Sequence, residues 1–349
     1  MLVGDAWKLA DEWVRKQAAP GEGFVGAYLG GSTASMPEKA ELPAGSDVDV
    51  FVVLEGEAAP PKLGKFLYGG ALLEVTYLPW SGLDSVEKVL GSYHLAGGIR
   101  NGRMSADPSG RLGAIQREAV RCFPERFWVE RRCRDALQRM KDGLSRTEPD
   151  LPWHDRVTAW LFPTGVAAHV ILTAALRNPT IRLRYLAARG VLEEYGLSGC
   201  YDELLQQLGS AKLRQARVEH HLAGLSRTFD AAASAARTPF FFSSDITPEA
   251  RPIAIQASLE LIRSGNHREA AFWIAATYAR CRKILAADAP ELLKPLAPDF
   301  DELMEDLGIR SQADLERRAQ RTLAYLPRLE EIAAALMERN PDIAGSTRA

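Results

Sequence analysis

Two aspartates at the start of an apolar segment are the residues whose spacing first indicates chemistry. Asp47 and Asp49 flank Val48, the first residue of the β-branched and apolar run Val48–Leu54. Because side chains alternate along a β-strand, both aspartates should project to the same side. Neighbouring carboxylates repel each other and are costly to remove from water. A divalent cation removes this objection, and Mg²⁺ is the expected ion because it binds carboxylate and phosphate oxygens together.

Glu74 is the third candidate acid, because it interrupts the otherwise apolar run Leu72–Tyr77. Three carboxylates can hold two metal ions, and such a pair stabilises the attacking and leaving oxygens of an in-line displacement at phosphorus. Asp47, Asp49 and Glu74 are therefore the predicted catalytic and metal-binding residues, with two Mg²⁺ ions expected.

A glycine-rich turn precedes this pair of aspartates. Gly30 and Gly31 allow the backbone to approach a phosphate closely and to direct its N–H groups at the anion. Ser32 adds a hydroxyl donor, and a helix that begins near Ser32 would add the positive end of its dipole. Gly30, Gly31 and Ser32 are therefore the predicted nucleotide-binding residues.

Taken together, these residues resemble the nucleotidyltransferase superfamily with the DNA polymerase beta-like fold, which includes aminoglycoside- and lincosamide-modifying enzymes. The resemblance rests on Gly31–Ser32, on Asp47 and Asp49 around Val48, and on the later strand acid Glu74. It implies that the Gly–Ser pair holds the terminal phosphates of a nucleotide, that the paired aspartates bind the metals, and that the third acid binds metal or acts as general base. The third acid is more commonly an aspartate in this family.

The resemblance also implies an activity, namely metal-dependent transfer of AMP from ATP to a hydroxyl of a small-molecule acceptor, with release of pyrophosphate. Three alternatives remain open. In the first, the acceptor is a protein or the end of an RNA. In the second, the chain is an antitoxin-like or regulatory nucleotide-binding protein. In the third, the helical part is an RNase that uses Arg214 with His220 or His221.

The hydrophobic pattern predicts an α+β fold in which a small mixed sheet with flanking helices precedes an all-helical region. The elements expected in the first part are a helix over Asp5–Ala18, strands over Phe24–Leu29, Val48–Leu54, Lys65–Tyr68 and Ala71–Leu78, a short helix over Asp84–Leu90, and a last strand and turn within Met104–Gly110. From Arg111 onward, apolar residues recur at steps of three and four, which predicts helices. We expect a catalytic domain over residues 1–125 and a helical substrate-binding or accessory domain over residues 126–349.

Composition constrains partners and location. The formal net charge of −2 and the pI of about 6.4 argue against nucleic acid as the main partner, since phosphate-binding proteins usually carry a basic excess. The sequence contains no window of 18 uninterrupted apolar residues, so we expect no membrane span. The N-terminus lacks the pattern of a signal peptide. Four scattered cysteines without zinc-ligand spacing fit the reducing cytoplasm.

Overall fold

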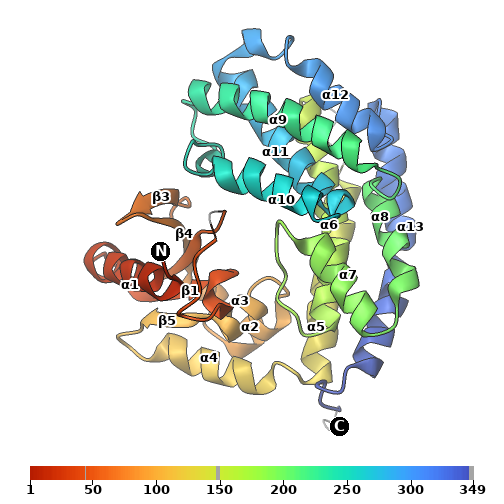
Figure 1. Ribbon diagram of the computed structural model, residues 1–349. Helices are drawn as coiled ribbons and strands as arrows, with labels where there is room; N and C mark the ends of the chain where they lie inside the picture. Colours follow the sequence, from red (N-terminus) through yellow and green to blue (C-terminus); the bar gives the residue numbers. More distant parts are fainter. Residues whose placement is uncertain (44, 147–149, 346–349) are drawn as a thin grey trace. The chain divides into compact units, whose positions relative to one another are not determined.

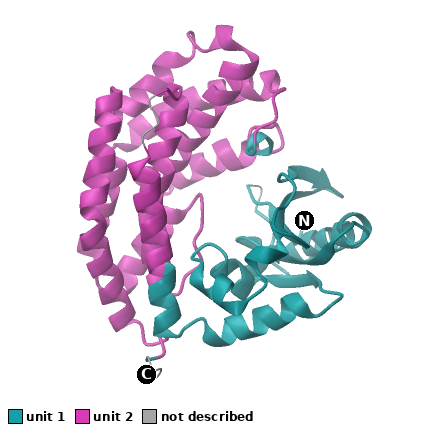
Figure 2. Cartoon of the chain, turned by 180° about the vertical axis from the view of Figure 1, so that it is seen from behind, with its two compact units in different colours: residues 1–132, 241–245, 345–349 teal, residues 133–240, 246–344 magenta. Residues whose placement is uncertain are grey.

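The chain forms two compact units in a computed structural model that describes residues 1–43, 45–146 and 150–345 (Figure 1). The first unit comprises chiefly residues 1–132 together with Phe241–Asp245, and the second comprises Cys133–Phe240 and Ile246–Ala344 (Figure 2). The first is an α+β region with a mixed five-stranded sheet and the second is mostly helical, which confirms the predicted fold class.

The sheet of the first unit is mixed in direction. Its strands are β1 (Phe24–Gly30), β2 (Val48–Leu54), β3 (Gly64–Tyr68), β4 (Ala71–Pro79) and β5 (Arg103–Ala106), in the spatial order β3-β4-β2-β1-β5. β2 and β4 are parallel, whereas the pairs β1–β2, β1–β5 and β3–β4 are antiparallel. The two central strands, β2 and β4, are those that carry the predicted acids.

Helix α1 (Val3–Trp13) and the π-helical turn that continues it (Val14–Ala18) cover one face of this sheet. Their buried residues form one hydrophobic core with Val48 and Val50 of β2 and with the apolar residues on either side of Glu74 in β4. Because side chains alternate along a strand, burying the valines against α1 turns Asp47 and Asp49 to the opposite face. Packing of the core thus fixes the direction of the acids.

A two-residue turn fixes the register between β3 and β4. Gly69 and Gly70 have φ values of +57° and +89°, a left-handed conformation at both positions that matches a tight hairpin turn. The resulting register pairs Tyr68 with Ala71 and, three pairs further along, Lys65 with Glu74.

Three further helices follow in the first unit: α2 (Val86–Gly91), α3 (Ala96–Asn101) and α4 (Arg111–Cys122). Ser85 caps α2 by accepting a hydrogen bond from the backbone N–H of Lys88. The sequence did not predict α3, because Gly97 and Gly98 give this segment a low intrinsic helix propensity. The predicted strand within Met104–Gly110 is confirmed but is short and begins at Arg103.

Nine α-helices occupy the described part of the chain after residue 125. They are α5 (Arg126–Ser145), α6 (Trp153–Ala174), α7 (Arg184–Glu194), α8 (Tyr201–Leu208), α9 (Gln215–Ala235), α10 (Ala257–Arg263), α11 (His267–Asp288), α12 (Ala297–Asp306) and α13 (Gln312–Arg339). The boundary expected between residues 125 and 126 lies at the start of α5. Within the helical unit, α11 packs against α9 and α6, and α13 packs against α6.

Helix α6 is the most apolar of these helices and contains Pro163 without being divided. Its length and composition would suffice to cross a membrane, and 78% of its most apolar window is buried within the structure. Such burial is what the core helix of a helical unit shows, because its whole surface packs against neighbouring helices.

Candidate metal and phosphate site

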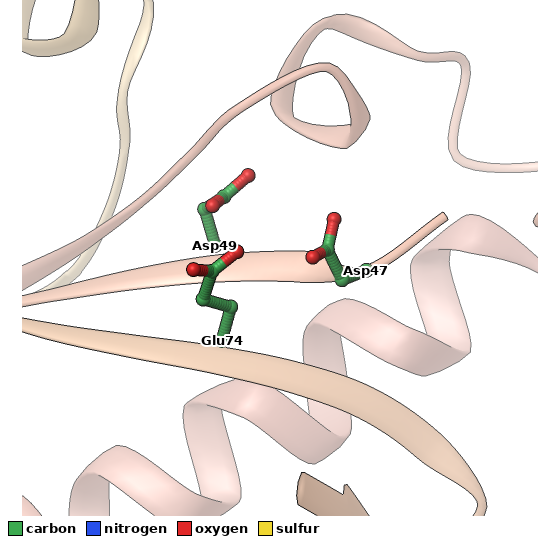
Figure 3. A group of neighbouring side chains, drawn as sticks. All are labelled: Asp47, Asp49 and Glu74. Carbon is green, nitrogen blue, oxygen red and sulfur yellow. The ribbon is translucent and has the colours of Figure 1, made fainter. Parts of the chain in front are cut away.

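The three acids predicted from the sequence lie together on the sheet face opposite α1. One carboxylate oxygen from each of Asp47, Asp49 and Glu74 lies within 4.8 Å of the others. Asp49 and Glu74 are directly paired across the parallel strands β2 and β4, and Asp47 lies in the extended residues just before β2 (Figure 3). All three are partly buried. Carboxylates at this spacing form an acidic group that can hold a metal ion.

The glycine turn lies directly against Asp49. Gly30 pairs with Asp49 across β1 and β2, and a Cβ on Gly31 would lie 1.7 Å from the Oδ2 of Asp49. Gly31 also has a φ of +68°, a conformation that residues with side chains rarely adopt. The chain therefore needs glycine at position 31 for both conformation and space, and the Gly31 backbone lies against an acid of the triad.

Ser32 is followed by a short turn. The chain forms a three-residue 3₁₀ turn there (Thr33–Ser35), so the condition of a helix beginning near Ser32 is not met and no helix dipole acts at Ser32. Ser32 itself is exposed at the end of the glycine turn. Its neighbour Thr33 is buried and donates a hydrogen bond of 3.3 Å from its hydroxyl to the backbone carbonyl of Asp47. The turn thus fastens the segment that carries Asp47.

Two lysines and a fourth acid complete the acidic group, and the sequence analysis missed all three. The ammonium group of Lys65 lies 2.6 Å from Glu74, 2.6 Å from Asp245 and 3.3 Å from Asp47. Lys62 forms an ion pair with the other carboxylate oxygen of Glu74. Burial lowers the pKa of Lys65, but the charges of Asp245 and Asp47 outweigh that effect and raise the pKa overall. Lys65 therefore carries a positive charge at neutral pH.

Asp49 has an unusual affinity for protons. Burial, and after it the charge of Asp47, raise the pKa of its carboxyl to about 7, although Lys65 and Lys62 oppose the shift. A carboxylate that is hard to ionise beside a second carboxylate is the arrangement expected where a cation normally compensates the charge. Perturbed pKa values of this kind concentrate at functional sites.

This shift predicts how stability depends on pH. Between the ordinary aspartate pKa of about 4 and the folded value of about 7, the folded state binds more protons at Asp49 than the unfolded state does. The contribution of Asp49 to the free energy of unfolding therefore falls as pH rises through this window. Asp49→Asn removes this contribution, so the variant should gain stability relative to the wild type as pH rises. Urea unfolding in chelator-treated buffer measures the difference, and a difference independent of pH would contradict the assignment.

The residues considered for an RNase lie in the helical unit, and both histidines are paired with acids there. His221 is buried with its Nε2 2.8 Å from Asp306, and the Nε2 of His220 lies 2.9 Å from Glu302. Arg217 bridges the same two acids. Arg214 is exposed at the N-terminal end of α9. The network joins α9 to α12 and accounts for both histidines as packing contacts.

No model of a known protein family matches the chain, and no curated protein matches its sequence. What stands is an N-terminal mixed five-stranded sheet with helices, carrying the acidic triad Asp47, Asp49 and Glu74.

Proposed function

We propose that the chain is a metal-dependent nucleotidyltransferase that moves AMP from ATP to a hydroxyl of a small-molecule acceptor. The observation that carries the proposal is the packing of Gly31, at positive φ, against Asp49 of a three-carboxylate group. Only a glycine at position 31 lets the backbone of the turn lie this close to the carboxylate, so that phosphate-binding N–H groups and a metal-binding acid can be neighbours.

The donor set fits Mg²⁺, which takes oxygen ligands and is bound in nucleotide enzymes by one or two carboxylates together with phosphates. Asp47, Asp49 and Glu74 would hold it. Bound there, Mg²⁺ would supply positive charge that stabilises the charge developing on the phosphoryl oxygens.

The chain's own groups have separate tasks in the proposed reaction. The Gly30–Gly31 backbone and the Ser32 hydroxyl bind and orient the terminal phosphates, which become the leaving pyrophosphate. The acceptor oxygen attacks the α-phosphorus as the bond to the bridging oxygen breaks. A carboxylate of the triad accepts the hydroxyl proton, and general base catalysis of this kind contributes about 10²–10⁴-fold.

The position of the label separates this reaction from its alternatives. ATP labelled in the α-phosphate is incubated with the full chain, Mg²⁺ and a panel of aminoglycosides, lincosamides, nucleosides, proteins and RNA. The proposal expects the label on a small molecule and unlabelled pyrophosphate in solution. Label on a protein or an RNA end would replace the acceptor class, and retention of all label in ATP across the panel would contradict the activity.

Variants in the helical unit separate the RNase hypothesis. Arg214→Ala and His220→Ala should leave nucleotide transfer unchanged, because both residues belong to the surface and ion-pair network of α9. A loss of RNA cleavage in these variants, with no nucleotide transfer by the wild type, would favour the RNase instead.

A further inference from the structure

The ammonium group of Lys65 lies among three carboxylates. An ammonium has three N–H donors, and three acids from three segments surround it: Asp47 before β2, Glu74 on β4, and Asp245 in the 3₁₀ turn Ser243–Asp245. The Lys65 side chain is 8% exposed, whereas that of Lys62 is 24% exposed. A buried cation that donates hydrogen bonds to two acids and forms an ion pair with a third is a fixed part of the site, and differs from a surface ion pair that solvent competes for.

The turn that carries Asp245 is fitted closely to the strand of Lys65. Gly64, which precedes Lys65, has a φ of +80°, and a Cβ at this position would lie 2.4 Å from the Cβ of Ser244. The residue beside Lys65 is thus a glycine at the place where the turn approaches the backbone. Asp245 lies outside the three-carboxylate group, yet it contacts the same ammonium as two of its members. Its structural task is to hold Lys65.

The net charge of the groups around Lys65 can be balanced by one divalent cation. Four carboxylates face two ammonium groups, so two negative charges remain when all of these groups are ionised. Among the residues that the structure describes, Asp49 forms no ion pair, whereas Lys62 and Lys65 take the two oxygens of Glu74. The uncompensated negative charge is therefore concentrated at Asp49, beside the glycine turn.

We propose that Lys65 is a resident cation that takes the place of one of the two metal ions expected for this acidic group, held there by Asp245. The inference rests on the metal site of the proposed function and revises its stoichiometry to one divalent cation per chain. Lys65 then supplies a positive charge that remains bound when the metal dissociates. Because Lys65 is largely withdrawn from water, its attraction to the neighbouring carboxylates is weakened less by solvent than that of a surface pair.

Counting bound Mn²⁺ tests the inference without any substrate. Titration of the full chain with Mn²⁺, followed by electron paramagnetic resonance of the free ion, should give one Mn²⁺ per chain for the wild type. Lys65→Gln keeps a hydrogen-bond donor and removes the charge, so it should bind two Mn²⁺ per chain, and Lys65→Met should do the same. Two Mn²⁺ on the wild type would overturn the inference, and this measurement does not depend on whether the variants fold.

Two matched variants show whether the effect belongs to Lys65. Lys62→Gln removes an ammonium from the same acid, Glu74, at a more exposed position, and should still bind one Mn²⁺. Lys65→Arg keeps the charge and should also bind one. If Lys65→Gln, folded by circular dichroism, binds the same number of ions as the wild type with the same affinity, the inference is wrong.

Stability without metal gives a second readout. In chelator-treated buffer, Lys65→Gln leaves the carboxylates short of one counter-charge, so it should unfold at a lower temperature than the wild type and recover on addition of Mn²⁺. If Mn²⁺ raised the unfolding temperature of the wild type and of the variant by the same amount, the result would count against a resident cation. Failure of the proposed function would appear separately, as absent nucleotide transfer alongside an intact difference in Mn²⁺ binding.

Discussion

Asp47→Asn and Asp49→Asn are each expected to lower nucleotide transfer by about 10³-fold or more. Each change replaces a carboxylate of the triad by an amide of the same shape, so a metal ligand is lost without a change in volume. Charge stabilisation by a bound metal is worth several kcal/mol in the transition state, and about 1.4 kcal/mol corresponds to a tenfold change in rate. The initial rate of label transfer from α-labelled ATP measures the effect.

A matched control separates this effect from a general loss of negative charge. Asp84→Asn removes an acid in the same unit that forms an exposed ion pair with Lys88. Its transfer rate should stay within about twofold of the wild type, since exposed pairs contribute little. Full activity in both triad variants would refute the assignment of the acids.

Gly31→Ala should have the second largest effect. The new Cβ would meet the Oδ2 of Asp49 at 1.7 Å, so the acid has to move away from the position it shares with Glu74. The positive φ of Gly31 adds about 1–2 kcal/mol of strain for a residue with a side chain. We expect transfer to fall by about 10²-fold or more, because a misplacement of about 1 Å in a positioned group can have that effect. Transfer rates at saturating Mg²⁺ and ATP provide the measurement.

Gly110→Ala is the control for strain alone. Gly110 has a φ of +73°, close to that of Gly31, and a Cβ there would meet nothing within 4 Å. Both variants should therefore carry a similar backbone strain, and only Gly31→Ala adds a clash, so Gly110→Ala should keep its transfer rate. A comparable loss of activity in both variants would show that backbone strain explains the result, rather than the contact with Asp49.

Much of this site follows from local sequence patterns. Alternation in Val48–Leu54 was enough to place Asp47 and Asp49 on one face, because Val48 and Val50 had to be buried on the other. The same pattern placed Glu74 on its strand, although only the parallel pairing of β2 and β4 set it beside Asp49. Lys65 could also have been predicted from the sequence, since the Gly69–Gly70 turn fixes the hairpin register that pairs it with Glu74.

Other parts of the site have no local signal. Asp245 reaches Lys65 across 180 positions of sequence, and its own segment shows no periodicity that indicates a partner. The turn Thr33–Ser35 is joined to the Asp47 carbonyl by a hydrogen bond from the Thr33 hydroxyl, a contact made only when the loop folds back. Long-range contacts of this kind depend on tertiary packing, which the hydrophobic pattern does not encode.

Binding of an unreactive ATP analogue tests the central claim most directly, because it requires no knowledge of the acceptor. The thermal unfolding of the full chain is followed with α,β-methylene ATP, with and without Mg²⁺, for the wild type and for Asp49→Asn. Ligand at about 100 times its dissociation constant stabilises a folded protein by about 2.7 kcal/mol. The account predicts a rise in Tm of the wild type that requires Mg²⁺ and is lost in Asp49→Asn. An unchanged Tm, or an equal rise in the variant, would show that the acids bind no metal and triphosphate together.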